Sequence, residues 1–261
     1  MPVETTQDTF FEGKLTLIQP LDGYRSSIDA LLLAYFASIG RASHQAIDLG
    51  AGCGIVGLSL LLMKHVKQVT AIEAQPELAE LAKQNAALNE VDKQYTISIK
   101  DIRKLKDDSE IRHSFDLVIT NPPFWPTTHR LPANPQRRIA CHEVLGTLSD
   151  WIHAASQLVS YKRGRLVLIY PAQRTTLLLN TFAKVGFSTS KMMLVHPFPH
   201  KCAELILVEA RPRKEGVMSI LPPLFLKQAD GTDTETLRRI VSGTFSEALS
   251  SLPDIRNIQL G

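Results

Sequence analysis

The chain has 261 residues, of which 44% are hydrophobic and 21% charged, and its net charge is +3. This is the composition of an ordinary globular protein with a sizeable core. The first residues lack the basic and apolar segments of a signal peptide, and the longest apolar run, residues 54–63, is about half of a membrane span. The distant Cys53, Cys141 and Cys202 argue against disulfides or a cysteine-rich zinc site. We therefore expect a cytoplasmic protein with no membrane contact and no metal.

Strand and helix patterns alternate along the chain. Strands are expected at residues 45–50, 68–74, 94–101, 115–120, 165–170, 188–195 and 203–209. Helices are expected at residues 26–40, with apolar side chains along one face, and at 55–65, 76–89, 148–160 and 173–185. Strands connected through helices predict a mainly parallel α/β sheet. The last two strands are joined by a short turn, which predicts that they pair antiparallel.

One domain with two extensions is expected from this pattern. The alternation covers residues 45–210, and residues 1–44 and 211–261 lie outside it. The C-terminal extension contains a strand-like segment and a helix pattern.

A glycine-rich loop follows the strand at 45–50 and opens a helix. Its sequence IDLGAGCG contains three glycines, Gly50, Gly52 and Gly54. Such glycines allow a sharp turn and close approach of a ligand, although a tight strand–helix turn without a ligand is the alternative. Glu73 ends the next strand, where its carboxylate can accept both ribose hydroxyls of a nucleoside. Asp101 ends the third strand and can accept an adenine amino group. These strand ends meet at one sheet edge, which predicts a nucleotide site.

Asp48 indicates which nucleotide binds. A dinucleotide places its pyrophosphate at the helix N-terminus, and an acid leading into the loop repels phosphate. The same acid suits the ammonium of a methionine moiety. This favours S-adenosylmethionine (SAM) over NAD.

The segment FDLVITNPPF, residues 115–124, is a buried strand stopped by Asn and two prolines. The side-chain oxygen of Asn121 and the carbonyl of Pro122 can accept the two N–H groups of an exocyclic amine and free its lone pair for a methyl group. Pro122 fixes its own φ and Pro123 restricts Pro122, so the carbonyl is aimed in advance. Phe124 can stack on a flat base. The alternative is a strand that simply ends in a proline turn; no general base is assigned.

Together, DLGAGCG, Glu73, Asp101 and NPPF resemble the motifs of class I SAM-dependent methyltransferases across residues 45–210. This resemblance implies a Rossmann-like sheet of six parallel strands and one antiparallel strand, with helices on both faces. NPPF is similar to the motif of enzymes that act on adenine N6, guanine N2 or glutamine amides. Four further segments resemble the tRNA1(Val) adenine-N6 methyltransferases: residues 13–36, 133–143, 195–212 and 221–224.

The second resemblance covers nearly the whole chain and implies the substrate: an adenosine just 3′ of the anticodon of a valine tRNA. It also implies that Tyr24, Arg25 and the following helix close over the methionine end of SAM. Arg25 would pair with the SAM carboxylate, and a surface arginine is the alternative. Many relatives have Arg at the position of Cys141; if that Arg binds RNA, Arg137 and Arg138 are candidate replacements here.

Residues 151–203 contain no Asp or Glu, which is typical of a polyanion-binding face, although solvated cations pointing in several directions are the alternative. The cations expected to bind RNA are Arg130, Arg137, Arg138, Lys162, Arg163, His200 and Lys201. His142 and Glu143 are expected to be loop structure or substrate contacts.

Three other functions compete with tRNA adenine-N6 methylation. An rRNA guanine-N2 methyltransferase shares NPPF but often duplicates the domain. A protein glutamine N5-methyltransferase usually has Tyr after the prolines and a helical N-terminal domain. A non-enzymatic RNA-binding protein would not need Asp48, Glu73, Asp101 and Asn121 together. The oligomeric state is not predicted.

Overall fold

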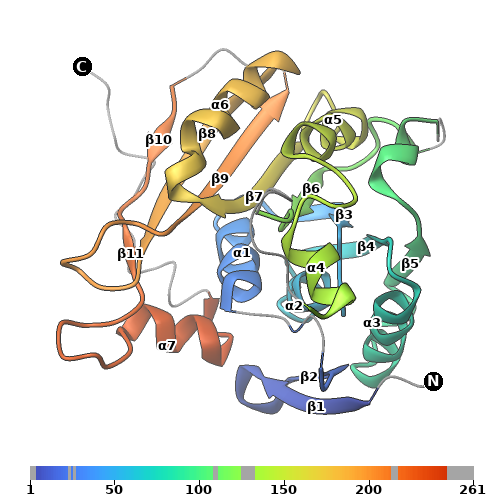
Figure 1. Ribbon diagram of the computed structural model, residues 1–261, viewed down its shortest axis with the longest axis horizontal. Helices are drawn as coiled ribbons and strands as arrows, with labels where there is room; N and C mark the ends of the chain where they lie inside the picture. The colour runs from blue at the N-terminus through green and yellow to red at the C-terminus, as the bar shows by residue number, and fades with distance from the viewer. Residues whose placement is uncertain are drawn as a thin grey trace.

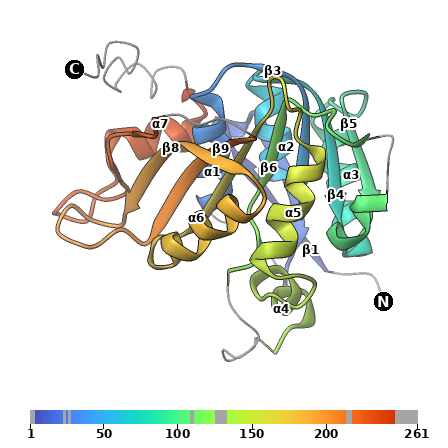
Figure 2. The same ribbon diagram turned by 90° about the horizontal axis from the view of Figure 1, so that it is seen from above.

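The computed structural model describes residues 4–22, 25, 28–107, 111–124, 133–212 and 217–245. A mixed β-sheet runs through the molecule, and helices cover both of its faces (Figures 1 and 2). Its strands are β3 (Ser43–Leu49), β4 (Val66–Glu73), β5 (Tyr95–Ile99), β6 (Leu117–Thr120), β7 (Arg165–Pro171), β8 (Phe187–His196), β9 (Leu205–Pro212), β10 (Ser219–Ile220) and β11 (Leu224–Phe225). Its helices are α1 (Ile28–Ser38), α2 (Ile55–Leu62), α3 (Pro76–Leu88), α4 (Pro135–Cys141), α5 (Leu148–Leu158), α6 (Thr175–Lys184) and α7 (Glu235–Ser242).

The strand order is β10-β8-β9-β7-β6-β3-β4-β5, with β11 also paired to β8. In the described part of the sheet, only β9 runs antiparallel to its neighbours β7 and β8. The predicted Rossmann-like sheet, including its antiparallel last pair, is therefore confirmed. The tail contributes more than the one strand-like segment expected, because both β10 and β11 extend the β8 edge.

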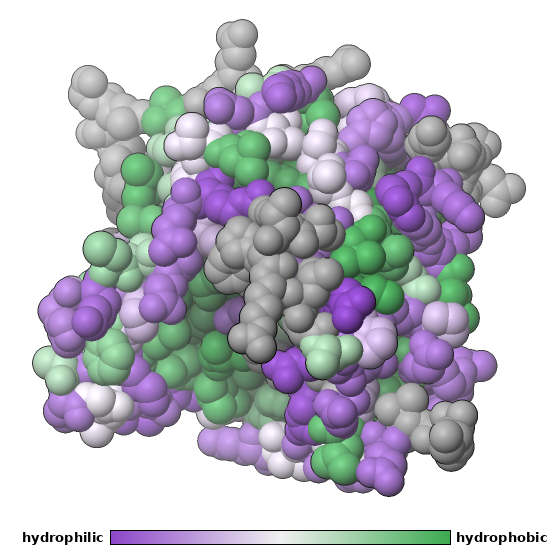
Figure 3. Space-filling model, in the orientation of Figure 1, coloured by the Kyte–Doolittle hydropathy of each residue, from purple (hydrophilic) through white to green (hydrophobic). Residues whose placement is uncertain are grey.

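Two hydrophobic clusters lie on opposite faces of the sheet. Along β7, Val167 and Ile169 join the cluster under α1 and α2, whereas Leu166 and Leu168 join the cluster under α5 and α6. Successive side chains of a strand point to opposite faces, so a strand covered on both sides must be apolar throughout. On the outer face seen in Figure 1, hydrophilic and hydrophobic side chains are interspersed (Figure 3), as on most folded domains.

Helix α1 differs from the expectation of a single apolar face. Every residue from Ala30 to Ser38 is buried. The helix contacts α2, β7, β9 and α7, so neighbours enclose it on all sides. A helix that is apolar all round belongs in a core, and this one is a structural centre of the domain.

The sequence did not predict the hairpin formed by β1 (Thr5–Phe10) and β2 (Leu15–Pro20), which stands apart from the main sheet. Two asparagines of α3 hold it. Asn85 exchanges hydrogen bonds with the backbone N–H and C=O of Ile18 at 2.7 and 3.0 Å, and Asn89 does the same with Thr16. Asn85 also donates to the carbonyl of Cys53 at 2.9 Å, so one buried amide links the hairpin to the glycine loop.

Helix α4 is a second element that the sequence analysis did not predict. Asn134 caps it by accepting the N–H of Arg137 at 3.1 Å, and Pro135 occupies its first turn. The helix projects beyond one edge of the sheet (Figure 2). Within the described residues, no helix is long and apolar enough to cross a membrane, and no group of three or more His, Cys, Asp or Glu side chains could hold a metal.

Candidate active site

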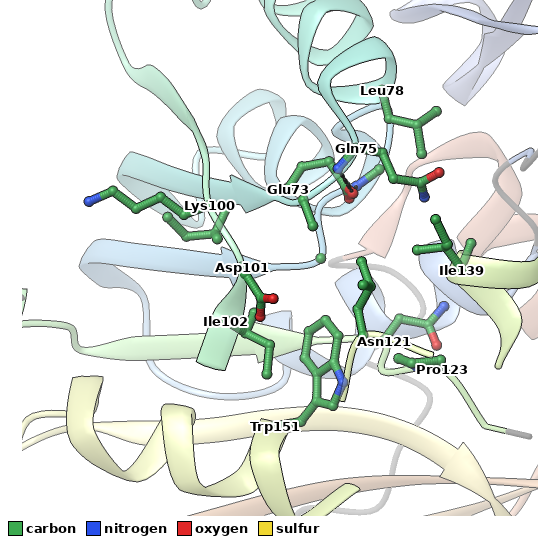
Figure 4. Close-up of a pocket in the computed structure, with 16 residues that line it drawn as sticks. Glu73, Gln75, Leu78, Lys100, Asp101, Ile102, Asn121, Pro123, Ile139 and Trp151 are labelled. Carbon is green, nitrogen blue, oxygen red and sulfur yellow. Dashed lines mark hydrogen bonds between the residues drawn. The ribbon is translucent and has the colours of Figure 1, made fainter. Parts of the chain in front are cut away.

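A pocket lies at the carboxyl ends of β3, β4, β5 and β6 (Figure 4). Six of the residues predicted from sequence line it: Gly50, Gly52, Glu73, Asp101, Asn121 and Pro123. Thr120, fully buried at the end of β6, donates to the carbonyl of Leu49 at 3.0 Å and ties the ends of two strands together. The residues after these strands, Asn121 and Gly50, therefore start side by side, as the strand-end rule for parallel sheets predicts.

Glu73 is held by the loop it faces. Its carboxylate accepts the N–H of Gly52 at 2.8 Å and the N–H of Gln75 at 2.9 Å. The side chain is 6% exposed, and burial raises its pKa, while the backbone N–H groups oppose that rise. These two bonds go to different oxygens, which fixes the orientation of the carboxylate in the pocket wall.

Asp101 occupies the neighbouring wall of the pocket. Its carboxylate lies 2.5 Å from the guanidinium of Arg103, which lowers the pKa of Asp101. The group is therefore ionised at neutral pH and can only accept hydrogen bonds. Both of its oxygens already accept hydrogen bonds from Arg103, so the predicted contact with an adenine amino group stays a prediction.

Asp48 lies behind the loop and is not among the residues that line the pocket. It is 2% exposed and accepts the N–H of Gly57 at 3.1 Å, so its visible contact is with the start of α2. Burial, together with the charge of Glu73, raises the pKa of Asp48 to about 7. Its predicted contact with the methionine ammonium stays a prediction.

The raised pKa of Asp48 has a consequence for stability. The folded state binds the proton more tightly than the unfolded chain, whose aspartate has a pKa near 3.8, so this extra stability is complete below pH 4 and is lost as the pH rises to about 7. Asp48→Asn keeps an acceptor for Gly57 without the charge. As the pH rises from 5 to 8, we expect the free energy of unfolding of the wild type to fall by about 2 kcal/mol relative to that of the variant. Urea unfolding of both proteins at the two pH values measures this difference. An equal difference in the free energy of unfolding between variant and wild type at both pH values would contradict the raised pKa of Asp48.

Trp151, on α5, lines the pocket and was missed by the sequence analysis. A Cβ built on Gly50 would lie 2.7 Å from the Trp151 ring, which is too close for any larger residue. Gly50 also has a φ of 72°, a backbone conformation that favours glycine. Ile72 and Ile102 extend the apolar wall beside the indole. The sequence around Trp151 carries no local signal of this role, because only the packing of α5 on the sheet brings the side chain to the pocket.

The NPPF segment is fixed from behind. Pro122 and Pro123 are buried, and the ring of Phe124 packs edge-on against Tyr170 with centroids 5.9 Å apart. The N–H of Phe124 donates to the carbonyl of Cys141 at 3.2 Å. This backbone contact does not depend on the side chain at position 141, so the cysteine there leaves the attachment of the segment intact.

Arg174 completes this support. Its guanidinium donates to the carbonyl of Phe124, lies 3.3 Å from the carboxylate of Glu143, and sits over the ring of Tyr170 at 5.4 Å from the centroid. Glu143 is thus a structural partner of the arginine, in agreement with its expected loop role. His142 is 5% exposed beside it.

We expect Arg174→Met to slow methyl transfer by about tenfold, because a loosened segment no longer aims the acceptors at Asn121 and Pro122. SAM affinity should be unchanged, and Arg174→Lys should recover part of the rate. Single-turnover assays and SAM titration separate the two effects. Arg238→Met, which breaks an exposed ion pair with Glu235, is the matched control. Equal losses in both variants would rule out a positioning role.

The predicted closure of Tyr24 and Arg25 over SAM can be examined only for Arg25. Tyr24 and Arg130 lie outside the described residues. Arg25 donates to Thr6 and to the carbonyl of Pro20, and it pairs with Asp8 at 2.7 Å. Its guanidinium is therefore engaged with the hairpin, and a contact with the SAM carboxylate stays a prediction.

The predicted RNA-binding cations divide between two edges of the sheet. Arg137 and Arg138 are on α4, whose Ile139 and Ala140 line the pocket. His200 and Lys201 are in the β8–β9 turn, at the same edge. Lys162 and Arg163 precede β7 and lie at the opposite, amino edge. The acid-free segment 151–203 therefore does not form one continuous surface, and RNA binding by Lys162 and Arg163 stays a prediction.

Other cations of that segment are paired inside the protein. Arg165 and Lys191 each lie 3.6 Å from the carboxylate of Glu209. An acid just outside the segment thus neutralises part of its charge, which a count along the sequence does not show.

Comparison with known proteins agrees with this geometry. The family "Methyltransferase small domain" matches residues 27–140. A tRNA1(Val) (adenine(37)-N6)-methyltransferase of Porphyromonas gingivalis is 34% identical over 214 residues, which covers 80% of this chain and 83% of the relative. A release factor glutamine methyltransferase of Deinococcus radiodurans is 29% identical over 123 residues, 47% of this chain and 42% of the relative.

Among solved structures, a predicted O-methyltransferase from Agrobacterium tumefaciens has a TM-score of 0.66 at 24% identity, covering 82% of this chain and 96% of that one. The fold and the site thus define a class I SAM-dependent methyltransferase, an enzyme whose cofactor is SAM. Within this class, the chain belongs to the tRNA1(Val) (adenine(37)-N6)-methyltransferase family.

Proposed function

We propose that the protein transfers a methyl group from SAM to N6 of the adenosine just 3′ of the anticodon of a valine tRNA, in the cytoplasm. The similarity to the P. gingivalis tRNA1(Val) (adenine(37)-N6)-methyltransferase supports the reaction. The observation that carries the proposal is that Asn121, the expected amine acceptor, lines the same pocket as Glu73 and Asp101, the expected nucleoside acceptors.

The pocket residues fit SAM. Glu73 offers two oriented oxygens to the ribose hydroxyls, and Asp101 offers an ionised acceptor to the adenine amino group. Trp151, Ile72 and Ile102 supply the apolar wall on which a flat ring can rest. SAM brings an electrophilic methyl group on a sulfonium. The protein's own residues bind and orient the target amine.

Asn121 and Pro122 would activate the target amine. The amine lone pair is delocalised into the base, so an acceptor for each N–H draws the nitrogen toward tetrahedral geometry. Both acceptors belong to a segment held by Phe124 and Arg174, and this preorganisation lowers the cost of reaching the transition state. Phe124 would stack on the everted base. The product ammonium loses its proton to water.

RNA would approach the carboxyl edge. Arg137 and Arg138 on α4 flank the pocket, and His200 and Lys201 stand further out on the β8–β9 turn. Such phosphate contacts position the RNA without reading its sequence. An anticodon loop offers unstacked bases, so placing one in the pocket costs less than from a duplex.

The test is transfer of labelled methyl from SAM to bulk tRNA that lacks its modifications, followed by nucleoside analysis and mapping. Methyl on N6 of an adenosine beside a valine anticodon supports the proposal. Label on guanosine N2, or on a protein glutamine as the name of the D. radiodurans relative describes, would leave the fold assignment intact and overturn the proposed substrate.

A further inference from the structure

A second hollow, of about 460 Å³, opens at the amino edge of the sheet. Ser43 lies beside Val66, and Leu117 beside Arg165, so β3 and β4 begin level, as do β6 and β7. Leu117 pairs with Ala46, so β6 and β7 begin three residues further along the sheet than β3, at the same amino edge. It is the edge opposite α4 and the pocket (Figure 2). We call this site the basal hollow. Its walls are the connections that lead into these strands and the end of β9.

The basal hollow is strongly basic. Seven cationic side chains line it: Arg41, Lys64, Lys67, Lys162, Arg163, Arg165 and Arg211. Asp116 is the one carboxylate among its described lining residues, and it accepts the N–H of His44 at 3.1 Å. Glu209, behind the wall, pairs with Arg165 and Arg211. Seven cations facing two carboxylates leave an excess of five positive charges.

The floor of the hollow is rigid. Arg165 is 3% exposed, and its guanidinium donates to the carbonyl of Ala37 at 3.2 Å. Gly40 packs against it so closely that a Cβ there would lie 2.9 Å from the guanidinium carbon. Burial and the charge of Arg165 lower the pKa of His65 to about 4, so this neighbour is neutral at physiological pH. Arg165 is thus a fixed, internally paired floor, and the cations free to meet an anion are the exposed ones around it.

The rim is also held in place. Lys162 and Arg163 lie in a tight turn closed by a 2.9 Å hydrogen bond from the N–H of Gly164 to the carbonyl of Ser160. A Cβ at Gly164 would lie 2.5 Å from that carbonyl oxygen, so the turn needs glycine. The two exposed cations therefore stand at a defined place beside the hollow.

We propose that the basal hollow binds backbone phosphates of the same RNA whose base enters the pocket, an inference that rests on the proposed function. The like charges that line the hollow repel one another, and a bound polyanion lowers this repulsion. Binding also releases the counterions of the polyanion, which favours the complex. Strand β3 has seven residues, so the two edges are on the order of 25 Å apart. An RNA whose loop is held at the pocket must extend over a distance of that order to place phosphates at the hollow. The loop occupies the pocket, and the stem reaches around the domain to the hollow.

The test is a triple variant, Lys67→Ala, Lys162→Ala and Arg163→Ala. The three side chains are exposed, and within the described residues they make no hydrogen bond or ion pair, so the fold should persist. Filter binding to a full-length valine tRNA transcript should weaken at least tenfold, with a salt slope shallower by about 2 to 3. Binding to a short hairpin of the anticodon loop and a few base pairs should not change.

The matched control removes the same charge elsewhere through Lys14→Ala, Lys83→Ala and Lys93→Ala, all exposed. Full-length tRNA affinity and salt slope equal to those of this control would overturn the proposal. A second contrary result would be a triple variant that inorganic pyrophosphate no longer stabilises against unfolding but whose tRNA affinity is unchanged. The hollow would then bind a free anion rather than RNA. Weaker capture of an acidic peptide with unchanged tRNA affinity would also overturn it. Because binding is read without turnover, a wild type that methylates no tRNA would overturn the proposed function and leave this comparison decisive.

Discussion

Replacing Asn121 with alanine is expected to lower the rate of methyl transfer by at least a hundredfold while leaving SAM affinity nearly intact. The side-chain oxygen would act only as the amine becomes tetrahedral, so its loss raises the barrier rather than weakening cofactor binding. Removing one such preorganised hydrogen-bonding group typically costs about 10²–10³ in rate. The fold should survive, because Asn121 is only partly buried and its strand is tied by Thr120 to Leu49.

Two further variants sharpen this experiment. Asn121→Asp keeps an acceptor and should retain more activity than the alanine variant. Asn180→Ala removes an exposed amide of the same size from α6 and should behave as wild type. Single-turnover rates with saturating SAM, together with SAM titration by calorimetry, separate chemistry from binding. If the alanine variant loses SAM affinity in proportion to its rate, Asn121 serves the cofactor and the acceptor assignment is wrong.

Glu73→Ala is expected to weaken SAM binding by about a hundredfold or more. Hydrogen bonds to a charged group are each worth about 1.5–3 kcal/mol, and two ribose hydroxyls would lose their acceptor. The change also leaves the N–H groups of Gly52 and Gln75 without the carboxylate that now accepts them, which should lower the free energy of unfolding by about 1–3 kcal/mol.

The control for Glu73 is Glu77→Ala, the same substitution at an exposed position in the first turn of α3. Glu73→Gln separates the two effects, since an amide can still accept one backbone N–H but carries no charge. SAM titration and urea unfolding of all three variants give both quantities. Unchanged SAM affinity in the folded Glu73→Ala protein would show that the ribose is held elsewhere.

The largest errors of prediction concern residues that lack a local pattern. Asn85 reads as an ordinary helix residue, yet it joins the β1–β2 hairpin to the glycine loop. Arg174 counted as one more cation of an acid-free segment, yet it holds the carbonyl of Phe124. Trp151 was only the start of that segment, yet it forms a wall of the pocket. Each role depends on a partner distant in sequence.

The sequence by itself determined the strand–helix alternation, the sheet, and the set of polar residues that ends successive strands. These features follow from local periodicity and from the rule that parallel strands end at one edge, so Gly50, Glu73, Asp101 and Asn121 could be placed together without coordinates. Only the tertiary structure decided which cations share a surface. Lys162 and His200 lie in the same acid-free segment, but the first precedes a strand and the second follows one. A strand carries the chain from one edge of the sheet to the other, so charges close in sequence come to face opposite sides of the domain.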